Sequence, residues 1–162
     1  MIRKATINDL ETLDQIYDAA RQFMIAHNNP NQWNDGHPNH EDLEMDIQKN
    51  QLYVIEIYQT IQASFVLFEH EDPTYEYIEG SWLNNHEYVV IHKVATRNEI
   101  KGMGTQILEY AKAKQKDVRI DTHQDNIPMQ NLLKKNGFQQ TGTIYLQNGS
   151  PRIAFQYVNK QD

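Results

Sequence analysis

The chain has 162 residues, 39% of them hydrophobic, which is enough for one buried core, and we expect a single domain over residues 1–162. The lack of cysteine excludes disulfides and a catalytic thiol. A net charge of −7 argues against a nucleic-acid-binding surface, and no apolar run is long enough to span a bilayer. Since no apolar segment follows Met1-Ile2-Arg3-Lys4, we expect a cytoplasmic protein that binds neither nucleic acid nor membrane.

The first half of the chain alternates strand and helix patterns. Asn8 and Glu11 have the spacing of a helix-start box, and Gln59-Thr60 separates two apolar runs as a hairpin turn would. The predicted elements are a strand at 2–5, a helix from about 8 to 26, a polar loop at 27–39, a short helix around Leu43 and Ile47, and strands at 52–58 and 61–69.

Residues 88–116 read as an apolar strand, a short loop with Gly102 and Gly104, and a helix. Glycines there remove the side chains that would block a pyrophosphate, and the first free amides of the helix point toward such an anion. The segment therefore predicts a phosphate-binding loop. The alternative is an ordinary tight turn.

The remainder predicts a strand, a loop and a helix, followed by a closing hairpin. Met129, Leu132 and Leu133 share one helical face, Pro128 fits the first turn, and Gly137 can end the helix in the left-handed conformation. The last two predicted strands are 138–146 and 152–158, on either side of Asn148-Gly149.

Positive charge is concentrated around the glycine loop. Residues 1–91 carry 4 Lys or Arg against 16 Asp or Glu, whereas residues 92–116 carry 6 against 2. Cations before a helix are unfavourable unless an anion lies between them and the helix dipole. Lys93, Arg97 and Lys101 are therefore expected to attract an anionic ligand, so that its binding weakens steeply with salt.

Two blocks of the sequence resemble motifs of the GNAT superfamily of acyl-CoA-dependent N-acetyltransferases. In the first block Val94, Gly102 and Gly104 match the end of a strand and the pattern Gln/Arg-x-x-Gly-x-Gly/Ala, with Glu99 in place of Gln or Arg. We expect the Glu99 side chain to point outward. In the second block the matching residues are Asn126, Leu132, Lys135, Gly137 and Phe138.

The resemblance implies an α/β (α+β) fold with a central mixed, mostly antiparallel sheet of about six to seven strands and about four flanking helices. It also implies N-acetyl transfer from acetyl-CoA, as acyl-donor substrate and without a metal, to a small-molecule or peptide amine, in a monomer or a homodimer. The residues expected to contact CoA are Val94, Ala95, Lys101, Gly102, Met103, Gly104, Thr105 and Asn126. A non-catalytic acyl-CoA-binding or sensing module is the alternative function.

Acetyl transfer to nitrogen needs a base for the ammonium and an acid for the leaving thiolate. His92 is the first candidate base, because it precedes Val94 by two residues and would share its face of a strand. Glu69 and Glu87, at strand ends, are the candidates acting through water. Leu133 replaces the family tyrosine proposed as the acid, so Tyr145 is a possible substitute. Each candidate also has a purely structural interpretation. His92 could be a buried histidine of the core, Glu69 and Glu87 solvated charges at strand ends, and Tyr145 a half-buried aromatic of a strand.

Aromatic and acidic residues indicate where a cationic amine could bind. Trp33 and Trp82 are the expected acceptor contacts, with a solvated acidic loop as the alternative. His37 and His40 have no third ligand at metal-site spacing, so we predict no metal there. The residues accompanying the tryptophans are Tyr75, Tyr77, Glu71, Asp72, Glu76 and Glu79.

Overall fold

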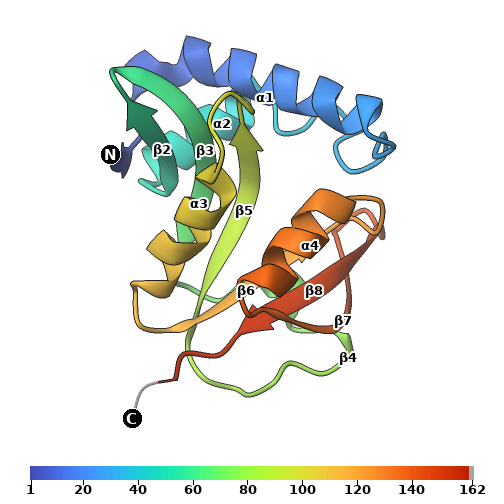
Figure 1. The fold of residues 1–162 in the computed structure, drawn as a ribbon. Coiled ribbons are helices and arrows are strands. Elements are labelled where there is room, and N and C mark those ends of the chain that lie inside the picture. The colour runs from blue at the N-terminus through green and yellow to red at the C-terminus, as the bar shows by residue number, and fades with distance from the viewer. Residues whose placement is uncertain (161–162) are drawn as a thin grey trace.

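The computed structural model describes residues 1–160 and contains an eight-stranded mixed sheet flanked by four α-helices (Figure 1). The strand order is β1-β2-β3-β5-β6-β8-β7-β4. The strands are β1 (Ile2–Lys4), β2 (Leu52–Ile57), β3 (Thr60–Phe68), β4 (Glu79–Gly80), β5 (Tyr88–Thr96), β6 (Asp117–Thr122), β7 (Gln139–Tyr145) and β8 (Pro151–Tyr157). The helices are α1 (Leu10–Ala26), α2 (His40–Gln48), α3 (Met103–Lys112) and α4 (Ile127–Lys135), with short 3-10 turns at Ile7–Asp9 and Pro73–Tyr75.

The strands β5 and β6 are the parallel pair of this sheet, and their pairing stops early. The ladder runs from Tyr88 opposite Asp117 to Ile91 opposite Ile120, although β5 continues for five further residues. Beyond Ile91, the backbone N–H and C=O groups of β5 that point toward β6 are therefore not part of the β5–β6 ladder. The sheet has a gap at this point, between the carboxyl ends of its two central strands (Figure 1).

Helices cover the two faces of the sheet. On one face α1 and α2 pack through Leu13, Ile16 and Leu43 against β2 and β3. On the other face α3 packs on β3, β5 and β6 through Ile107 and Leu108, and α4 joins the same core. Figure 1 shows α1 crossing the end of β5, so its carboxyl-terminal part reaches toward α4 across the gap.

The expected α/β fold class is confirmed, with one more strand than the six to seven expected. The additional strand is β4, whose Glu79 and Gly80 pair with Thr143 and Gly142 of β7. A pair of two residues gives no alternating pattern, so the sequence carries no signal for it.

Two local expectations are wrong by a few residues. The helix-start box is formed by Thr6 and Asp9 rather than by Asn8 and Glu11, because a 3-10 turn precedes α1. The β2–β3 turn lies at Tyr58–Gln59, one residue earlier than expected, and both residues have positive φ. Positive φ at both central residues is the geometry of a type I′ hairpin turn, which is usually made by Asn or Gly.

A β-bulge reorients the end of β5. Lys93 has φ of 53°, and the register with β3 shifts between Ser64 opposite Ala95 and Val66 opposite His92. The extra residue places His92 and Lys93 on the face covered by α2, while Val94 packs on the opposite face against the α3 core. The expectation that His92 and Val94 share one face is therefore wrong.

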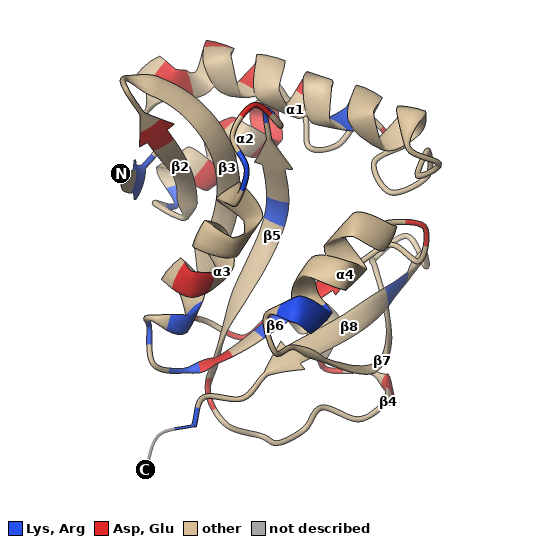
Figure 2. Cartoon of the chain, viewed as in Figure 1, with Lys and Arg blue, Asp and Glu red and all other residues tan. Residues whose placement is uncertain are grey.

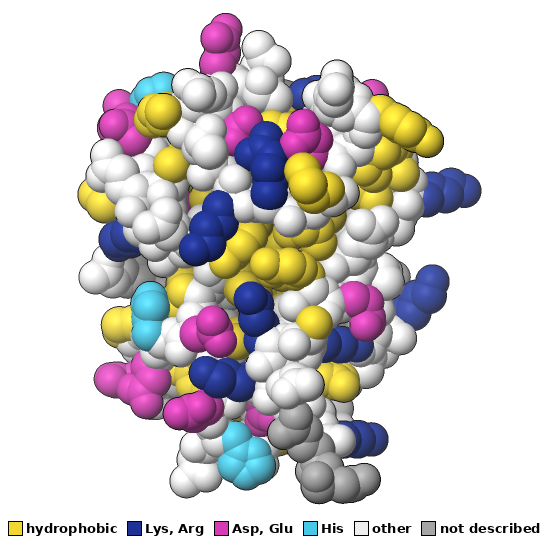
Figure 3. All heavy atoms as spheres, turned by 90° about the vertical axis from the view of Figure 1, so that its left-hand side faces the viewer, with side chains coloured by type: hydrophobic (Ala, Val, Ile, Leu, Met, Phe, Trp, Pro, Cys, Tyr) yellow, Lys and Arg dark blue, Asp and Glu magenta, His cyan; other side chains and the backbone are white. Residues whose placement is uncertain are grey.

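One edge of the molecule has apolar side chains at its surface. Figure 3 shows them gathered in the middle of the face formed by β1, β2 and α3, with charged side chains around them. Ile2, Ile57 and Tyr110 from these elements are partly buried against the core. Within residues 1–160, none of the helices combines the length and the apolar character needed to cross a membrane.

Candidate active site

Two cavities meet where β5 and β6 separate. The glycine groove, about 390 Å³, lies between the end of α1, the end of β5, the start of α3 and α4. The histidine cavity, about 240 Å³, is enclosed by loop 27–39, the ends of β5 and β6, and the β7–β8 hairpin. Both cavities are lined by Met24, Val94, Asn126 and Met129, so they adjoin through the gap in the sheet.

The start of α3 presents unpaired backbone amides to the glycine groove. Side-chain oxygens of Asn39 and Asn126 cap α2 and α4, whereas α3 starts after Gly102 with no side-chain cap. The first amides of a helix have no intrahelical acceptor, so those of Met103, Gly104 and Thr105 are available to an anion. The groove therefore has the donors and the dipole that a phosphate group requires.

The two glycines of this loop have different roles. Gly102 has φ of +89°, and a Cβ built on it would have no heavy atom within 4 Å, so its requirement is conformational. A Cβ on Gly104 would lie 2.6 Å from Cδ2 of Leu132 in α4. Gly104 thus permits close packing of α3 on α4, and the expectation that its Cβ would directly crowd a pyrophosphate is not what this geometry indicates.

The structure brings together all eight residues that were expected to contact CoA. Lys101 and Met103 line a small cavity of about 200 Å³ that shares Gly102 and Gly104 with the groove. The Met103 side chain is buried in the core, so only its backbone is available there. The six that line the glycine groove are Val94, Ala95, Gly102, Gly104, Thr105 and Asn126.

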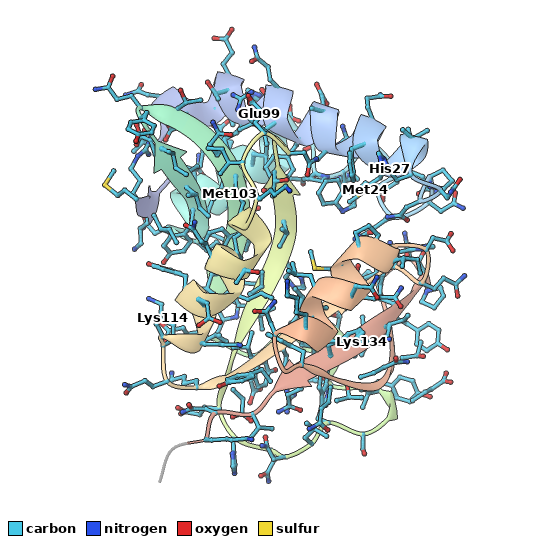
Figure 4. The ribbon with its side chains drawn as sticks, in the orientation of Figure 1. Met24, His27, Glu99, Met103, Lys114 and Lys134 are labelled. Atoms are coloured by element: carbon cyan, nitrogen blue, oxygen red, sulfur yellow. The ribbon has the colours of Figure 1, made fainter. Side chains whose placement is uncertain are left out.

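The carboxyl-terminal part of α1 forms a wall of the groove that the sequence interpretation did not assign. Ala20, Phe23, Met24 and His27 all line it, and Figure 4 shows Met24 and His27 at the end of α1 that faces α4. Their spacing of three and four residues puts them on one helical face. That spacing is the sequence signal from which a second ligand-facing surface could have been inferred.

Figure 2 shows basic residues on β5 and in the loop before α3. Two of them are bonded within the protein. Lys93 Nζ bonds Asp46 Oδ2 at 2.6 Å, and Arg97 Nε donates to the Ile61 carbonyl at 2.6 Å. Lys101 is exposed beside the small cavity. The Glu99 side chain is 59% exposed and lines none of the cavities, as expected for an outward orientation (Figure 4).

His92 is held by a buried carboxylate on one side. Its Nε2 lies 2.6 Å from Asp72 Oδ2, and the other oxygen of Asp72 accepts bonds from the backbone N–H and Oγ1 of Thr74. Burial would raise the pKa of Asp72, but the bonds from His92 and Thr74 lower it to about 2. Because an ionised carboxylate can only accept, Nε2 of His92 carries a hydrogen.

The other nitrogen of His92 is the one that can exchange a proton. Nδ1 lies 3.8 Å from Asp121 Oδ2, which accepts a 2.7 Å bond from the Tyr75 hydroxyl. Burial would lower the pKa of His92, but Asp72 and Asp121 raise it above its ordinary value. The His92 side chain is 27% exposed and lines the histidine cavity, so Nδ1 is a base within reach of a bound molecule.

The other candidate bases lie away from both cavities. Lys116 Nζ is 3.6 Å from a carboxylate oxygen of Glu69 and 3.6 Å from one of Glu87. β3 runs antiparallel to β5, so the end of β3 and the start of β5 lie side by side. They are at the opposite end of the strands from the gap between β5 and β6. The structure therefore does not bring Glu69 and Glu87 to the site.

Tyr145 is also outside the site. Its hydroxyl donates to Glu79 Oε1 at 2.6 Å on the exposed surface of β7, and its side chain lines neither cavity. This position gives it no access to a thiolate in the groove.

The two tryptophans lie in different places. Trp33 lines the histidine cavity, with its ring 5.8 Å from that of Tyr17. Trp82 lies elsewhere, under the guanidinium of Arg119 and bonded through Nε1 to the Tyr75 carbonyl. Of the two tryptophans, only Trp33 lines the cavity that contains His92.

His37 and His40 each lie next to one carboxylate. His37 Nδ1 bonds Asp42, and His40 Nδ1 lies 2.7 Å from Asp14 Oδ2. Within residues 1–160 the structure contains no group of three His, Asp or Glu side chains that could hold a metal ion.

Hydrogen bonds of Gln32 hold loop 27–39 in place over the histidine cavity. Its Oε1 accepts bonds of 2.8 Å from both Asn29 and Asn126, and its backbone carbonyl accepts a 2.9 Å bond from Arg152 Nη2. Asn126 also caps α4 by accepting from the Met129 N–H at 3.1 Å. Gln32 thus joins the loop to the start of α4 through its side chain and to β8 through its backbone carbonyl.

Asp121 and Arg152 line the histidine cavity but match no sequence motif. Asp121 could have been found, because it lies near the carboxyl end of a strand parallel to β5, where side chains of both strands meet. Arg152 has no such signal, because β8 is inserted between β6 and β7 only by tertiary pairing.

Comparison with solved structures identifies proteins of the same fold over the whole chain, whereas no family model and no protein of curated function matches it. An acetyltransferase of the GNAT family from Streptococcus agalactiae 2603 is 30% identical with a TM-score of 0.87, covering 99% of this chain and 96% of that one. A candidate acetyltransferase from Staphylococcus aureus Mu50 is 26% identical with a TM-score of 0.73, covering 99% of both chains.

A more distant neighbour, yncA from Salmonella typhimurium, was solved with its cofactor acetyl-CoA. It is 15% identical with a TM-score of 0.67, and the match covers 100% of this chain and 95% of that one. At that identity the likeness shows the fold alone. The full-length similarity to the streptococcal protein goes further, and it shows that the chain belongs to the GNAT family of acetyltransferases.

Proposed function

We propose that the protein transfers an acetyl group from acetyl-CoA to a primary amine by direct attack within a ternary complex. Two adjoining cavities support this proposal, because the glycine groove and the histidine cavity share four lining residues at the gap between β5 and β6. A donor in one and an acceptor in the other would meet there. The chain has no cysteine, so an acetylated thiol cannot serve as an intermediate.

The glycine groove fits the donor. The amides of Met103, Gly104 and Thr105 would bind the pyrophosphate, and the unpaired edge of β5 beyond Ile91 would hydrogen-bond the amides of the pantetheine arm. Acetyl-CoA supplies an activated acetyl thioester. Val94 and Met129 would flank the reacting end, since they line both cavities.

The histidine cavity fits the acceptor. The Nδ1 atom of His92 would take a proton from the ammonium, directly or through one water, while Asp72 fixes the ring through Nε2. The freed amine nitrogen then attacks the acetyl carbonyl carbon, so that a C–N bond forms and the C–S bond breaks. CoA leaves as a thiolate, which takes up the second proton that the nitrogen loses. Asp121 would attract the cationic acceptor before the proton is lost.

A non-catalytic acyl-CoA-binding module is the second candidate. Leu133, in place of the family tyrosine, is fully buried, and the residues lining the two cavities include no tyrosine that could protonate the thiolate. Thiol release from acetyl-CoA with a panel of primary amines, together with calorimetric titration of acetyl-CoA, separates the two functions. Turnover supports the enzyme, and tight binding without turnover supports the module. Absence of both contradicts either function.

Acetyl-CoA affinity should depend on salt less steeply than the sequence suggests, because Lys93 and Arg97 are bonded within the protein. We expect Lys101→Gln to weaken binding only a few-fold at low ionic strength, as for one exposed ion pair, and less at physiological ionic strength. Lys114→Gln, at the other end of the α3 region, is the matched control and should have no effect (Figure 4). Calorimetric titration at both ionic strengths measures this. Equal affinities for wild type and Lys101→Gln at low salt would leave the backbone amides as the sole anion contacts.

The assembly and the location of the protein are further expectations. A homodimer and a cytoplasmic location are both compatible with the proposed reaction. Sedimentation equilibrium over a range of concentrations distinguishes a monomer from a homodimer.

A further inference from the structure

Arg152 is a buried cation without an anionic partner. The residue is 7% exposed, and its guanidinium donates at 2.9 Å to two neutral acceptors, the carbonyls of Gln32 and Pro151. Among residues 1–160, no carboxylate oxygen lies within 4.0 Å of its nitrogens. A guanidinium has five N–H donors, and a buried charge without a counterion is costly. Burial lowers the pKa of Arg152, and the carboxylates of Asp121 and Asp35, which lie farther away than an ion-pair distance, offset this only in part.

Arg152 faces the same cavity as the candidate base. On β8 it lies two residues from Ala154, which pairs with Asp121 of β6, so Arg152 and Asp121 are diagonal neighbours on one face of the sheet. Such neighbours are about 7–8 Å apart. Asp121 is in turn 3.8 Å from His92 Nδ1 on β5. A cation, an anion and a base thus follow one another across three adjacent strands.

One polar side-chain atom in the cavity has no hydrogen-bond partner. The Oγ1 of Thr122 is buried without a hydrogen-bond partner, and Thr122 lines the histidine cavity beside Asp121. Buried polar atoms are nearly always bonded in proteins, so this unpaired hydroxyl, in a cavity that Arg152 also lines, points to a polar ligand.

The cavity is small. Its volume of about 240 Å³ lies below the range of about 300–1,000 Å³ typical of sites for drug-sized ligands. Its apolar lining includes Trp33, Pro38 and Leu146. The space suits a compact molecule with two charged ends better than a long polyamine.

We infer that the acceptor is a small amino carboxylate, whose carboxylate is bound by Arg152 and whose ammonium lies beside Asp121 and His92. This inference rests on the proposed acetyl transfer. A guanidinium matches a carboxylate with two parallel hydrogen bonds, which would satisfy the donors that Arg152 leaves free. The separation of opposite charges along the cavity would also orient the amine toward the gap where the two cavities meet.

The test compares acceptors that differ only in the carboxylate. Alanine and phenylalanine are each assayed beside their methyl esters and beside ethylamine and phenethylamine, by thiol release from acetyl-CoA. We expect kcat/KM for the free acids to exceed that of the esters and amines by about 10–100-fold, the value of a charge-assisted hydrogen-bonded pair. Arg152→Gln should remove this preference mainly by raising KM for the acids, and Arg152→Lys should keep part of it.

Arg119→Gln is the matched control. Arg119 is 5% exposed on the same sheet face but lines a different cavity together with Trp82, so its replacement should leave the preference for acids intact. Acetyl-CoA affinity measured by calorimetry should be unchanged in Arg119→Gln. If Arg152→Gln does not fold, the comparison of acids with esters in the wild-type protein still tests whether the cavity prefers a carboxylate.

The assays distinguish failure of the carboxylate subsite from failure of the acetyl-transfer proposal. Turnover of esters and simple amines at least equal to that of the acids overturns the carboxylate subsite and leaves acetyl transfer standing. If no acceptor is turned over although acetyl-CoA binds, the acetyl transfer proposal fails, and the CoA-bound protein is titrated with alanine and alanine methyl ester. Binding of alanine alone then supports the subsite, and equal binding or no binding overturns it.

Discussion

Replacement of His92 by glutamine is expected to lower kcat/KM about 10²–10⁴-fold and to leave acetyl-CoA affinity unchanged. Glutamine retains the size and the hydrogen-bonding capacity of the side chain but cannot accept a proton from the amine. His92 lines the histidine cavity and not the glycine groove, so donor binding should be insensitive to the change.

The pH profile provides the specific signature. The reactive form of His92 is the neutral one, so activity should fall as the pH drops through its pKa, and His92→Gln should abolish this limb. Since Asp72 and Asp121 raise that pKa, the limb should lie above the ordinary histidine value of about 6.5. Asp72→Asn removes the carboxylate that raises the pKa, so it should move the limb to lower pH.

Other outcomes would reassign His92. Full activity of His92→Gln with an unaltered pH profile would exclude it as the base and leave Asp121, acting through water, as the next carboxylate to test. Loss of folding or of acetyl-CoA binding would identify His92 as structural, held between Asp72 and Asp121.

Replacement of Gly102 by valine is expected to weaken acetyl-CoA binding by at least tenfold. Gly102 has φ of +89°, a conformation that costs a residue with a Cβ about 1–2 kcal/mol and a β-branched one more. Relief of that strain would turn the loop before α3 and displace the amides of Met103 and Gly104 from the anion site. Calorimetric titration with acetyl-CoA measures the loss.

Gly149 provides the matched control. It has φ of +85° in the β7–β8 hairpin, and a Cβ there would meet no heavy atom within 4 Å, as at Gly102. Gly149→Val should therefore cost similar stability without affecting acetyl-CoA affinity. Equal affinities of Gly102→Val and the wild type would contradict the anion site at α3.

Gly104→Val should behave differently from Gly102→Val. Its side chain would collide with Leu132, which lines the groove, so both thermal stability and acetyl-CoA affinity are expected to fall.

The parts of the site that follow from the sequence are those encoded within one segment. Gly102, Gly104 and the helix after them are consecutive, and so are Asn126 and the helix that it caps, so local chemistry is sufficient to predict them. The orientation of His92 was not predictable in this way. Lys93 adopts φ of 53° without being glycine or asparagine, and strand alternation assigns Val94 to the wrong face.

The residues around the candidate base depend on contacts that are distant in the chain. Asp72 reaches His92 from a 3-10 turn after β3, and Tyr75 of the same turn bonds Asp121 of β6. Arg152 joins them because β8 pairs with β6. Sequence periodicity identifies strands but not their lateral order, so the chemical character of the histidine cavity emerges only from the assembled sheet.

The bonds of Gln32 have a consequence for how binding of the donor and binding of the acceptor would affect each other. It is bonded at once to Asn126, which lines both cavities, and to Arg152, which lines only the histidine cavity. A ligand that shifts one of these partners changes the energy of the other bond. Such a linkage is reciprocal in thermodynamics: if the donor raises the affinity for the acceptor, the acceptor must raise the affinity for the donor by the same factor.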